Sequence, residues 1–598
     1  MPSQRIEDYA LLSDCHSAAL VGRDGSVDWL CLPRYDSPAV FSAVLGGPEH
    51  GRWLLRPVDQ DATCERRYLG DSFVLETTWT TSTGVVRVVD FMPTGDLRAD
   101  VVRRVEGVEG VVRMRQELVI RPDYAKTVPW VRRITDPDGL EGLLAVAGPD
   151  AFLLRGGPMP RAADHRHAGE WDQAAGEQHD VGLTWFRSFR DVPRRLDVGD
   201  RLAATLAWWQ DWADRADPGE HHPLAVRRSL LVLRALTHAD TGGIVAAATT
   251  SLPEDFGGER NWDYRYVWLR DAALTLEALL THGYREEAEG WRRWLLRAVA
   301  GEPADVQIMY GIAGERELPE TEQPQLPGYE GSRPVRTGNG AVDQYQADVL
   351  GEVLVALDRA RREGVPEDEF SWPLQRALLG FVEEHWQRKD HGIWEMRGEL
   401  QHFTHSRVMV WAALDRGVRA VREGGMDGPA ERWESLRDQV RAEVEEHGWD
   451  AERGTYTQVY GSPQVDASLL MLPQVGFLAA DDPRMLGTVA AVEEDLLRDG
   501  LVLRYDTGPG LDGLPGDEHP FLACSFWLVE QHARSGRVAD AHALMERCLA
   551  CASDLGLLSE EYDTRAGRQA GNVPQALSHL ALVRAADALG DCTPRGHR

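Results

Sequence analysis

The chain has 598 residues, of which 43% are hydrophobic and 27% are charged, and its formal net charge is -31. This length and composition allow a large globular core and more than one domain. A surface this acidic repels phosphate backbones and anionic lipid heads, which argues against a nucleic-acid or membrane partner and fits a neutral small-molecule substrate.

The N-terminal residues, Met1 to Tyr9, contain no basic segment followed by an apolar one, and no apolar run in the chain is long enough to span a bilayer. We therefore expect no signal peptide and a cytoplasmic protein. The seven cysteines are odd in number and scattered, which fits reduced thiols better than a disulfide framework.

Residues 1 to about 215 predict mainly β-strands. Two stretches rich in β-branched and aromatic residues, 73–80 and 85–92, flank a Thr-Ser-Thr-Gly turn and predict a hairpin. Residues 18–21 and 27–30 flank Gly22-Arg-Asp-Gly25 and predict a second strand pair. Many short strands bounded by turns indicate an antiparallel β-sandwich, to which we assign residues 1–218.

The apolar spacing becomes helical in residues 219–598, as in Trp411, Leu414 and Val418. This spacing predicts twelve helical segments, at about 221–239, 265–283, 286–300, 344–364, 372–388, 405–424, 429–447, 466–479, 482–498, 520–535, 538–553 and 574–590.

The connections between these segments are long after each odd-numbered segment and short after the even-numbered ones. Six antiparallel helix pairs closed in a ring would bring all the long connections to one rim, which is the arrangement of an (α/α)6 barrel. Long loops in a compact domain usually carry function, so we expect the site at this rim. An open solenoid of helix pairs has the same alternation and remains an alternative.

Two glutamates lie in these long connections, Glu395 in Gly392-Ile-Trp-Glu and Glu560 in Ser559-Glu-Glu-Tyr. Glycoside hydrolysis needs two carboxyl groups, one that protonates the leaving oxygen and one that activates water or attacks the sugar. We expect Trp394 to bury Glu395 and keep it protonated, and a polar neighbourhood to keep Glu560 ionised. The chain contains 96 Asp and Glu residues, so spacing alone does not separate this pair from ordinary surface glutamates.

A dense group of aromatic and charged residues lies between Arg260 and Asp271, at the start of the second predicted helix. It comprises Trp262, Tyr264, Arg265, Tyr266, Trp268 and Arg270. Aromatic rings and bidentate arginine or aspartate groups suit the apolar faces and hydroxyl groups of a sugar. A helix with a buried aromatic stripe would show the same pattern.

Together, these and other segments resemble glycoside hydrolase family 15, in its bacterial glucoamylase and trehalase-like branch. The segments that carry the resemblance to the catalytic domain are 266–272, 338–348, 392–395, 404–416, 501–505, 559–563 and 571–579. Residues 20–29 and 33–38 resemble the β domain that accompanies this branch, so the likeness covers most of the chain.

The resemblance implies hydrolysis with inversion, in which Glu395 is the general acid and Glu560 is the general base that holds water. It implies that the substrate is bound by Tyr266, Trp268, Arg270, Asp271, Trp394, Arg504 and Glu561. One departure is His519-Pro520, where the family has small residues, and this puts the choice of substrate in doubt.

The implied activity is exo-acting release of glucose from an α-glucoside, with trehalose as the first substrate, maltodextrins as the second and isomaltose-type linkages as the third. A disaccharide phosphorylase of similar architecture and a non-catalytic sugar-binding protein are the remote alternatives, and two intact carboxyl motifs argue against both. We expect no metal site and no cofactor, although a dependence on phosphate or magnesium stays open. A homo-oligomer stays open as well.

Overall fold

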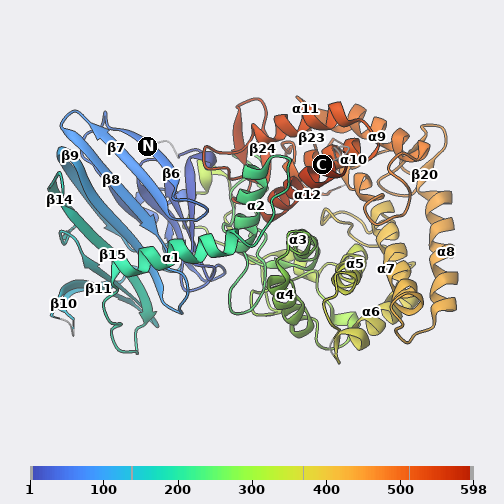
Figure 1. Cartoon of the computed structure of the whole chain (residues 1–598), viewed down its shortest axis with the longest axis horizontal. Helices are drawn as coiled ribbons and strands as arrows, with labels where there is room; N and C mark the ends of the chain where they lie inside the picture. Colours follow the sequence, from blue (N-terminus) through green and yellow to red (C-terminus); the bar gives the residue numbers. More distant parts are fainter. Residues whose placement is uncertain (1–3, 137–138, 368, 509, 511, 593–598) are drawn as a thin grey trace, which may run out of the picture.

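The computed structural model describes residues 4–136, 139–367, 369–508, 510 and 512–592. Figure 1 shows a β-sandwich on one side and a ring of helices on the other, joined by helix α1 (Val198–Ala213). None of the helices in these ranges combines the length and the apolar character that crossing a membrane requires.

The N-terminal domain is an antiparallel sheet that folds over itself along the long strand β9 (Ala99–Val119). The first half of β9 pairs with β8 and β15, and the second half pairs with β5 and β14. The other strands are β1 (Tyr9–Ser13), β2 (Ala18–Gly22), β3 (Ser26–Cys31), β4 (Ala39–Ser42), β5 (Arg52–Pro57), β6 (Thr63–Tyr68), β7 (Leu75–Thr81), β8 (Gly84–Phe91), β10 (Trp130–Thr135), β11 (Glu141–Ala147), β12 (Asp150–Gly156), β13 (Arg161–Ala163), β14 (Arg166–Ala174) and β15 (Gln178–Arg187).

Side chains from the two halves of this sheet meet in a buried cluster. It includes Leu55 of β5, Trp79 of β7, Val88 of β8 and Met114 of β9. Because successive residues of a strand point to opposite faces, each of these strands contributes alternate residues to the interior. The predicted β-sandwich is therefore confirmed, and so are the predicted hairpins β7–β8 and β2–β3.

Helix α1 was not predicted, because we expected residues up to about 215 to be mainly strands. Its apolar side chains Leu202, Leu206 and Trp209 recur at helical spacing and pack against the sandwich. Asp197 caps its first turn, since the carboxylate accepts a hydrogen bond from the backbone N–H of Asp200.

The same helix connects the two domains through its tryptophans. Trp209 packs edge to face on Phe73 of the sandwich, with ring centroids 5.1 Å apart. Trp212, one turn later, stacks on Tyr284 of the helical domain at 4.0 Å. Buried aromatic contacts of this size hold α1 firmly between the domains.

Eleven of the twelve predicted helical segments are α-helices in the described part of the chain. They are α2 (Pro223–Ala235), α3 (Leu269–Thr281), α4 (Arg285–Ala298), α5 (Asp348–Arg362), α6 (Ser371–His385), α7 (Thr404–Arg422), α8 (Ala430–His447), α9 (Pro483–Leu496), α10 (Leu522–Arg534), α11 (Val538–Leu549) and α12 (Ala576–Cys592).

The prediction for residues 466–479 was wrong, because they form only the short 3-10 helix η7 (Ala467–Met471) followed by turns. Pro473 explains the difference. A proline cannot donate the backbone hydrogen bond that continues a helix, so the hydrogen bonding stops here although Leu472 still has helical backbone angles.

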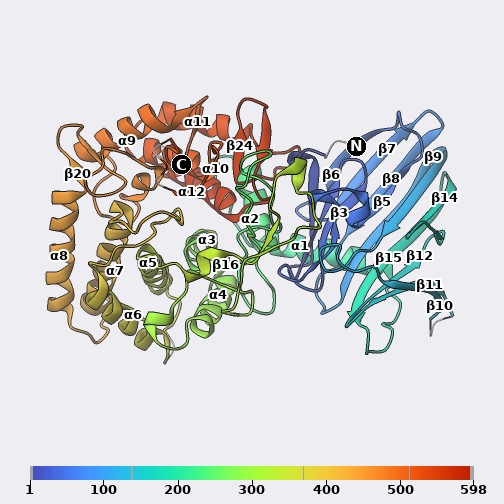
Figure 2. The ribbon, with the colours of Figure 1, turned by 180° about the vertical axis from the view of Figure 1, so that it is seen from behind.

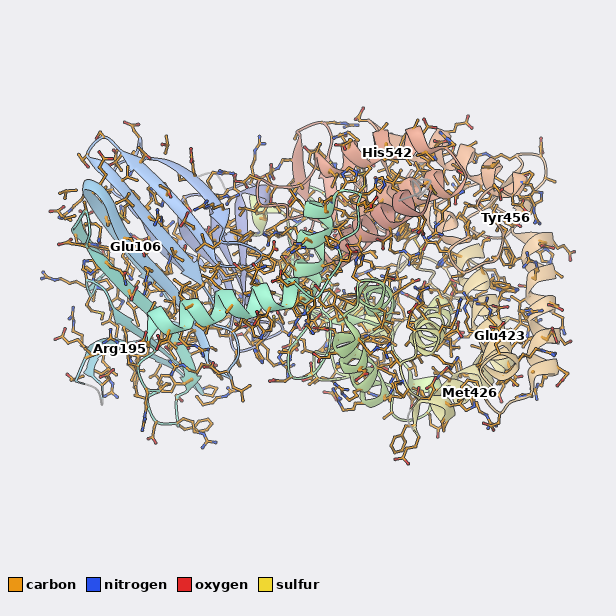
Figure 3. All side chains as sticks on the ribbon, in the orientation of Figure 1. Glu106, Arg195, Glu423, Met426, Tyr456 and His542 are labelled. Atoms are coloured by element: carbon orange, nitrogen blue, oxygen red, sulfur yellow. The ribbon has the colours of Figure 1, made fainter. Side chains whose placement is uncertain are left out.

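The helices close into a ring. α3 contacts α5, α5 contacts α7, η7 bridges α7 and α10, α10 contacts α12, and α12 contacts α3 again. The other helices from α2 to α11 pack outside this inner ring (Figure 1). Side chains fill the space that the ribbon leaves open inside it (Figure 3). The closed ring confirms the predicted (α/α)6 barrel and rules out the alternative of an open solenoid.

The long connections run from each outer helix to the next inner one and form short antiparallel strand pairs. Single β-bridges join neighbouring connections around the rim, including Phe521–Glu561 and Ala247–Gln575. The strands are β16 (Val267–Trp268), β17 (Met309–Tyr310), β18 (Thr321–Glu322), β19 (Arg336–Thr337), β20 (Trp449–Asp450), β21 (Thr455–Tyr456), β22 (Leu497–Arg498), β23 (Leu501–Val502), β24 (Glu561–Asp563) and β25 (Arg568–Ala570).

The rim also touches the sandwich. The connection between α4 and α5 lies between the two domains in Figure 2, where the backbone N–H of Gly328 donates to the carbonyl of Leu45 at 2.9 Å. From the sandwich side, the indole of Trp29 donates to the carbonyl of Ala248 at 2.9 Å. The N-terminal domain is thus part of the frame that holds the rim loops.

Candidate active site

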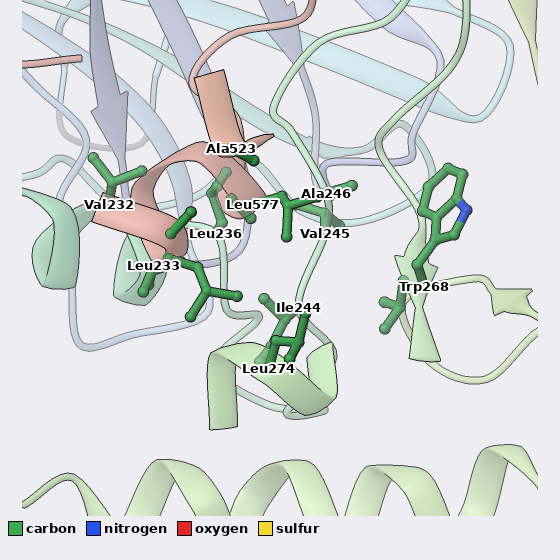
Figure 4. Packing of buried hydrophobic residues seen from close by; sticks show 14 of the residues in the cluster. Val232, Leu233, Leu236, Ile244, Val245, Ala246, Trp268, Leu274, Ala523 and Leu577 are labelled. Atoms are coloured by element: carbon green, nitrogen blue, oxygen red, sulfur yellow. The ribbon is translucent and has the colours of Figure 1, made fainter. Parts of the chain in front are cut away.

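A pocket opens at this rim, and the long connections build its walls. Ala246 and Leu577, which lie together in the hydrophobic core in Figure 4, form part of its floor. Seven of the nine predicted site residues line it: Trp268, Arg270, Asp271, Trp394, Glu395, Arg504 and Glu560. Residues far apart in the sequence therefore meet at one site, as the loop alternation predicted.

Glu395 lies in a tight turn between α6 and α7. Its φ of +59° is in the left-handed region, which residues with a Cβ rarely adopt and which is a feature of many functional sites. Trp268 Nε1 donates to Glu395 Oε1 at 2.6 Å, and Arg270 Nη2 lies 3.9 Å from the same oxygen. Burial raises the pKa of Glu395 above its usual range, although Arg270 and the hydrogen bond from Trp268 oppose the shift.

Trp394 lines the pocket next to Glu395, but its indole N–H makes its hydrogen bond to another carboxyl group. Its Nε1 donates to Asp466 Oδ2 at 2.8 Å, which fixes the ring as a wall of the pocket. Trp268 is the tryptophan that holds the Glu395 carboxyl group.

Glu560 lies deeper, directly before β24, and is almost completely buried. The Tyr264 hydroxyl donates to its Oε1 at 2.7 Å, while its Oε2 has no hydrogen-bond partner among the described residues. A buried carboxylate oxygen that borders a pocket and lacks a protein partner can accept a hydrogen bond from water.

The surroundings of Glu560 differ from the expected ones. Burial and then the nearby Glu254 raise its pKa well above the usual range, against the opposing effects of Arg504 and Tyr264. The neighbourhood is polar, as predicted, but its polar groups are mostly acidic. It therefore favours the protonated form of Glu560, where we expected it to favour the ionised form.

Arg504 is the cation of this wall. Its Nη2 lies 3.0 Å from Glu254 Oε2, 2.7 Å from Glu518 Oε1 and 3.5 Å from Glu561 Oε1. These carboxylates hold the guanidinium rigidly against the pocket, where it can donate to a substrate hydroxyl group.

Arg270 and Asp271 form a second polar pair on the floor. Arg270 Nε donates to Asp271 Oδ1 at 3.0 Å, and Arg270 Nη1 donates to the Ile393 carbonyl at 2.6 Å. The arginine thus ties the start of α3 to the turn that carries Glu395. A fixed guanidinium beside a carboxylate offers both donors and acceptors to vicinal hydroxyl groups of a sugar.

Two predicted residues do not line the pocket. Tyr266 is buried in the core, and Glu561 lies behind Arg504, where its Oε2 accepts a hydrogen bond from the backbone N–H of His519 at 3.1 Å. His519 and Pro520, which we expected to affect the choice of substrate, lie outside the lining as well.

The pocket also contains residues that we did not select. Tyr264 was noted in its motif but not chosen, and Glu254 was missed, since one glutamate among 96 acidic residues gives no signal apart from its place in a long connection. Further lining residues outside the prediction are Arg260, Trp262, Asn339, Ala341, Arg397, Tyr505, Leu514, Phe521 and Gln575.

Tyr264 and Trp268 together connect the two glutamates. Their rings meet edge to face with centroids 5.5 Å apart, and each donates to one of the two carboxyl groups. One short segment therefore positions Glu395 and Glu560 relative to each other. A partly buried carboxyl group and a buried one, in a pocket with fixed arginines, can supply the acid and the base of glycoside hydrolysis.

Comparison with known proteins agrees with the two-domain fold. A model of glycosyl hydrolases family 15 matches residues 222–542 and 533–587, and a model described as trehalase-like, N-terminal matches residues 2–156. A bacterial glucoamylase solved in complex with acarbose has the same fold, with a TM-score of 0.74 and 14% identity over 98% of this chain and 94% of that one.

Relatives in sequence extend over almost the whole chain. A trehalase of Mycobacterium tuberculosis is 39% identical over 98% of this chain and 89% of its own length. A trehalase of Thermoplasma acidophilum is 35% identical over 95% of this chain and 98% of its own length. By the family model and by these relatives, the chain belongs to glycosyl hydrolase family 15.

Proposed function

We propose that this glycosidase is a trehalase, an inverting exo-acting hydrolase that releases glucose from trehalose. The observation that carries the proposal is the pair of glutamates that Tyr264 and Trp268 hold in one pocket, in a chain whose relatives over nearly its full length are trehalases.

In this proposal Glu395 is the general acid. It lies two residues before Arg397, which is exposed and lines the pocket, so we place it beside the oxygen that leaves with the outer sugar. Its raised pKa favours the protonated form that an acid needs.

Glu560 is the general base. Its free Oε2 is suited to hold the water that attacks the anomeric carbon, and the Tyr264 hydroxyl fixes the other oxygen. Because a base must be ionised, the raised pKa of Glu560 restricts activity to pH values at which this carboxyl group has lost its proton.

Arg270 and Asp271 bind the hydroxyl groups of the terminal glucose, and Trp394 forms the wall beside its ring. The substrate is thus a neutral sugar. We further propose action in the cytoplasm, which the seven free cysteines support. That the enzyme needs no cofactor remains a prediction, and its oligomeric state is left open.

The test is glucose release by the purified protein from trehalose, maltose, maltoheptaose and isomaltose, with and without phosphate. We expect trehalose to be the preferred substrate. NMR should show one β-glucose and one α-glucose released per trehalose, because inversion changes the configuration only of the anomeric carbon that water attacks, and the leaving glucose keeps its α configuration. Formation of glucose 1-phosphate would make the protein a phosphorylase, and preference for maltoheptaose would make it a glucoamylase-type enzyme.

Two variants test the roles of the glutamates. Glu560→Gln and Glu395→Gln should each lower kcat by about 10²–10⁴-fold while trehalose still binds, because each removes one proton-transfer group and little volume. Near-normal turnover of either variant would contradict the role assigned to that residue.

A further inference from the structure

The pocket has a buried floor and an exposed mouth. Arg270 and Asp271 at the floor are less than one-tenth exposed, whereas Arg397 at the mouth is exposed and Leu514 beside it is partly exposed. The guanidinium of Arg397 lies over the ring of Trp262, with its Cζ 4.4 Å from the ring centroid. This cation–π contact holds both side chains in place at the mouth.

One segment of the β23–α10 connection borders this mouth, because its Leu514 lines the pocket beside Arg397. We call residues 512–518 the strap. Buried Arg260 holds the strap at three points: its Nη2 lies 2.5 Å from Asp512 Oδ2, its Nη1 lies 2.5 Å from Glu518 Oε1, and its Nε donates to the Pro515 carbonyl at 3.2 Å. Breaking a buried ion pair leaves an uncompensated charge, so these contacts keep the strap in place.

The backbone of the strap lies directly on the turn of Glu395. The N–H of Arg397 donates to the Asp512 carbonyl at 2.9 Å. Gly513 has a φ of +71°, and a Cβ at this position would lie 3.0 Å from the backbone nitrogen of Gly398. The positive φ and this close approach favour glycine here, and Leu514, the next residue, lines the pocket.

We propose that the strap closes the outer end of the pocket and limits the substrate to two glucose units. The first glucose occupies the floor, Glu395 lies at the bond, and the second glucose fills the space up to Trp262, Arg397 and Leu514. A third unit on the second ring would meet the backbone of the strap. Arg260 is the positioning residue, and the proposal rests on the exo-hydrolysis of α-glucosides proposed above.

The experiment compares each disaccharide with the trisaccharide that extends it. One pair is trehalose and trehalose that carries an α-1,4-linked glucose on one ring; the other is maltose and maltotriose. In the linkage that the wild-type protein cleaves, we expect kcat/KM for the trisaccharide to be at least about tenfold below that for the disaccharide, because the extra ring clashes with the mouth.

Two variants open the mouth in different ways. Leu514→Ala shortens the side chain that faces the pocket, and Gly513→Ala pushes the strap away from Arg397 and Gly398. Each should raise the ratio of trisaccharide to disaccharide kcat/KM by about tenfold. The matched control is Gly510→Ala, since Gly510 has a similar φ of +70° but open space around its Cβ, and this variant should keep the wild-type ratio.

The outcomes separate the two proposals. No glucose from any disaccharide contradicts the proposed hydrolase function. Glucose release with equal kcat/KM for both members of a pair, or an unchanged ratio in folded Leu514→Ala protein, leaves the hydrolase intact and overturns the strap as the limit of substrate length. If Gly513→Ala does not fold, Leu514→Ala decides alone.

Discussion

Arg504 lies within 3.5 Å of three glutamates with buried side chains, Glu254, Glu518 and Glu561. Glu560 directly precedes Glu561 in the chain. One guanidinium therefore neutralises only part of the negative charge in this wall, and each carboxylate makes it harder for the others to ionise. The pKa of Glu560 is raised for this reason as well as by its burial.

Glu254→Gln tests this electrostatic coupling. Removing the like charge lowers the pKa of Glu560, so the base becomes ionised at a lower pH and the acidic limb of the kcat/KM profile moves to lower pH. The pH profile of trehalose hydrolysis measures the shift. Glu446→Gln, on the exposed face of α8, should leave the limb in place. An unchanged limb in Glu254→Gln would show that Glu254 does not influence the base.

Single residues differ in how far the sequence reveals them. Glu395, Glu560 and Arg270 could be selected because they lie in motifs that resemble those of a family, and the structure brings all three into one pocket. Glu254 has no such signal, because its effect comes from proximity to Arg504 across the fold. The pKa of Glu560 could not be predicted either, since it depends on which charges the fold assembles around it.

The β24–β25 hairpin is the element that places the base. Glu560 directly precedes the hairpin, and Gly571 directly follows it. Gly571 has a φ of +76°. A Cβ on Gly571 would lie 2.7 Å from both the Cβ and the Oε2 of Glu560, so the chain passes against the carboxyl group. Only a residue without a side chain fits here.

Gly571→Ala should displace Glu560 and lower kcat by about 10²-fold, because small errors in the position of a reacting group are costly. Gly567→Ala, in the same hairpin, is the control. Its φ is +63°, but its Cβ would meet only the Tyr562 hydroxyl at 4.0 Å. Both variants carry a backbone penalty of about 1–2 kcal/mol, and Gly571→Ala adds the clash with Glu560. Gly571→Ala should therefore lose more thermal stability, and among the protein that still folds only this variant should lose turnover. Equal activity of the two would contradict the positioning role.

Among the secondary-structure elements, the apolar periodicity predicted most of the helices, but two elements were predicted wrongly. α1 was missed, although Leu202, Leu206 and Trp209 are spaced as in a helix, because the neighbouring segments predict strands. Residues 466–479 were assigned to a helix although Pro473 interrupts them. The two errors have different causes. Around α1 the local apolar spacing was correct and the strands before it were given more weight, whereas in residues 466–479 the apolar spacing was misleading and the proline should have been given more weight.

The two domains act together on the site, although none of the described residues that line the pocket comes from the sandwich. Arg265, next to Tyr264 in the chain, is completely buried against the sandwich. Its Nη2 donates to the Tyr124 hydroxyl at 2.7 Å, and its Nη1 donates to the Ser37 carbonyl at 3.0 Å. The sandwich therefore fixes the backbone from which Tyr264 reaches the base.

Tyr124→Phe tests this long-range support. The substitution removes one hydrogen bond to the Arg265 guanidinium and keeps the aromatic ring, so the protein should fold and the Tyr264 segment should be held less firmly. We expect kcat/KM for trehalose to fall several-fold, up to about tenfold, mainly through kcat, since each tenfold loss corresponds to ~1.4 kcal/mol of transition-state stabilisation.

The control variant must remove hydrogen bonding by a tyrosine hydroxyl group inside the sandwich without affecting Arg265. Tyr68→Phe does so, because the Tyr68 hydroxyl accepts from the backbone N–H of Leu11 at 2.8 Å and donates to the Leu11 carbonyl at 2.9 Å, both within the sandwich. If the two variants lose similar thermal stability and only Tyr124→Phe loses turnover, the loss comes from the position of Tyr264. An equal fall in kcat/KM for both would mean that the sandwich supports the barrel only through its overall stability.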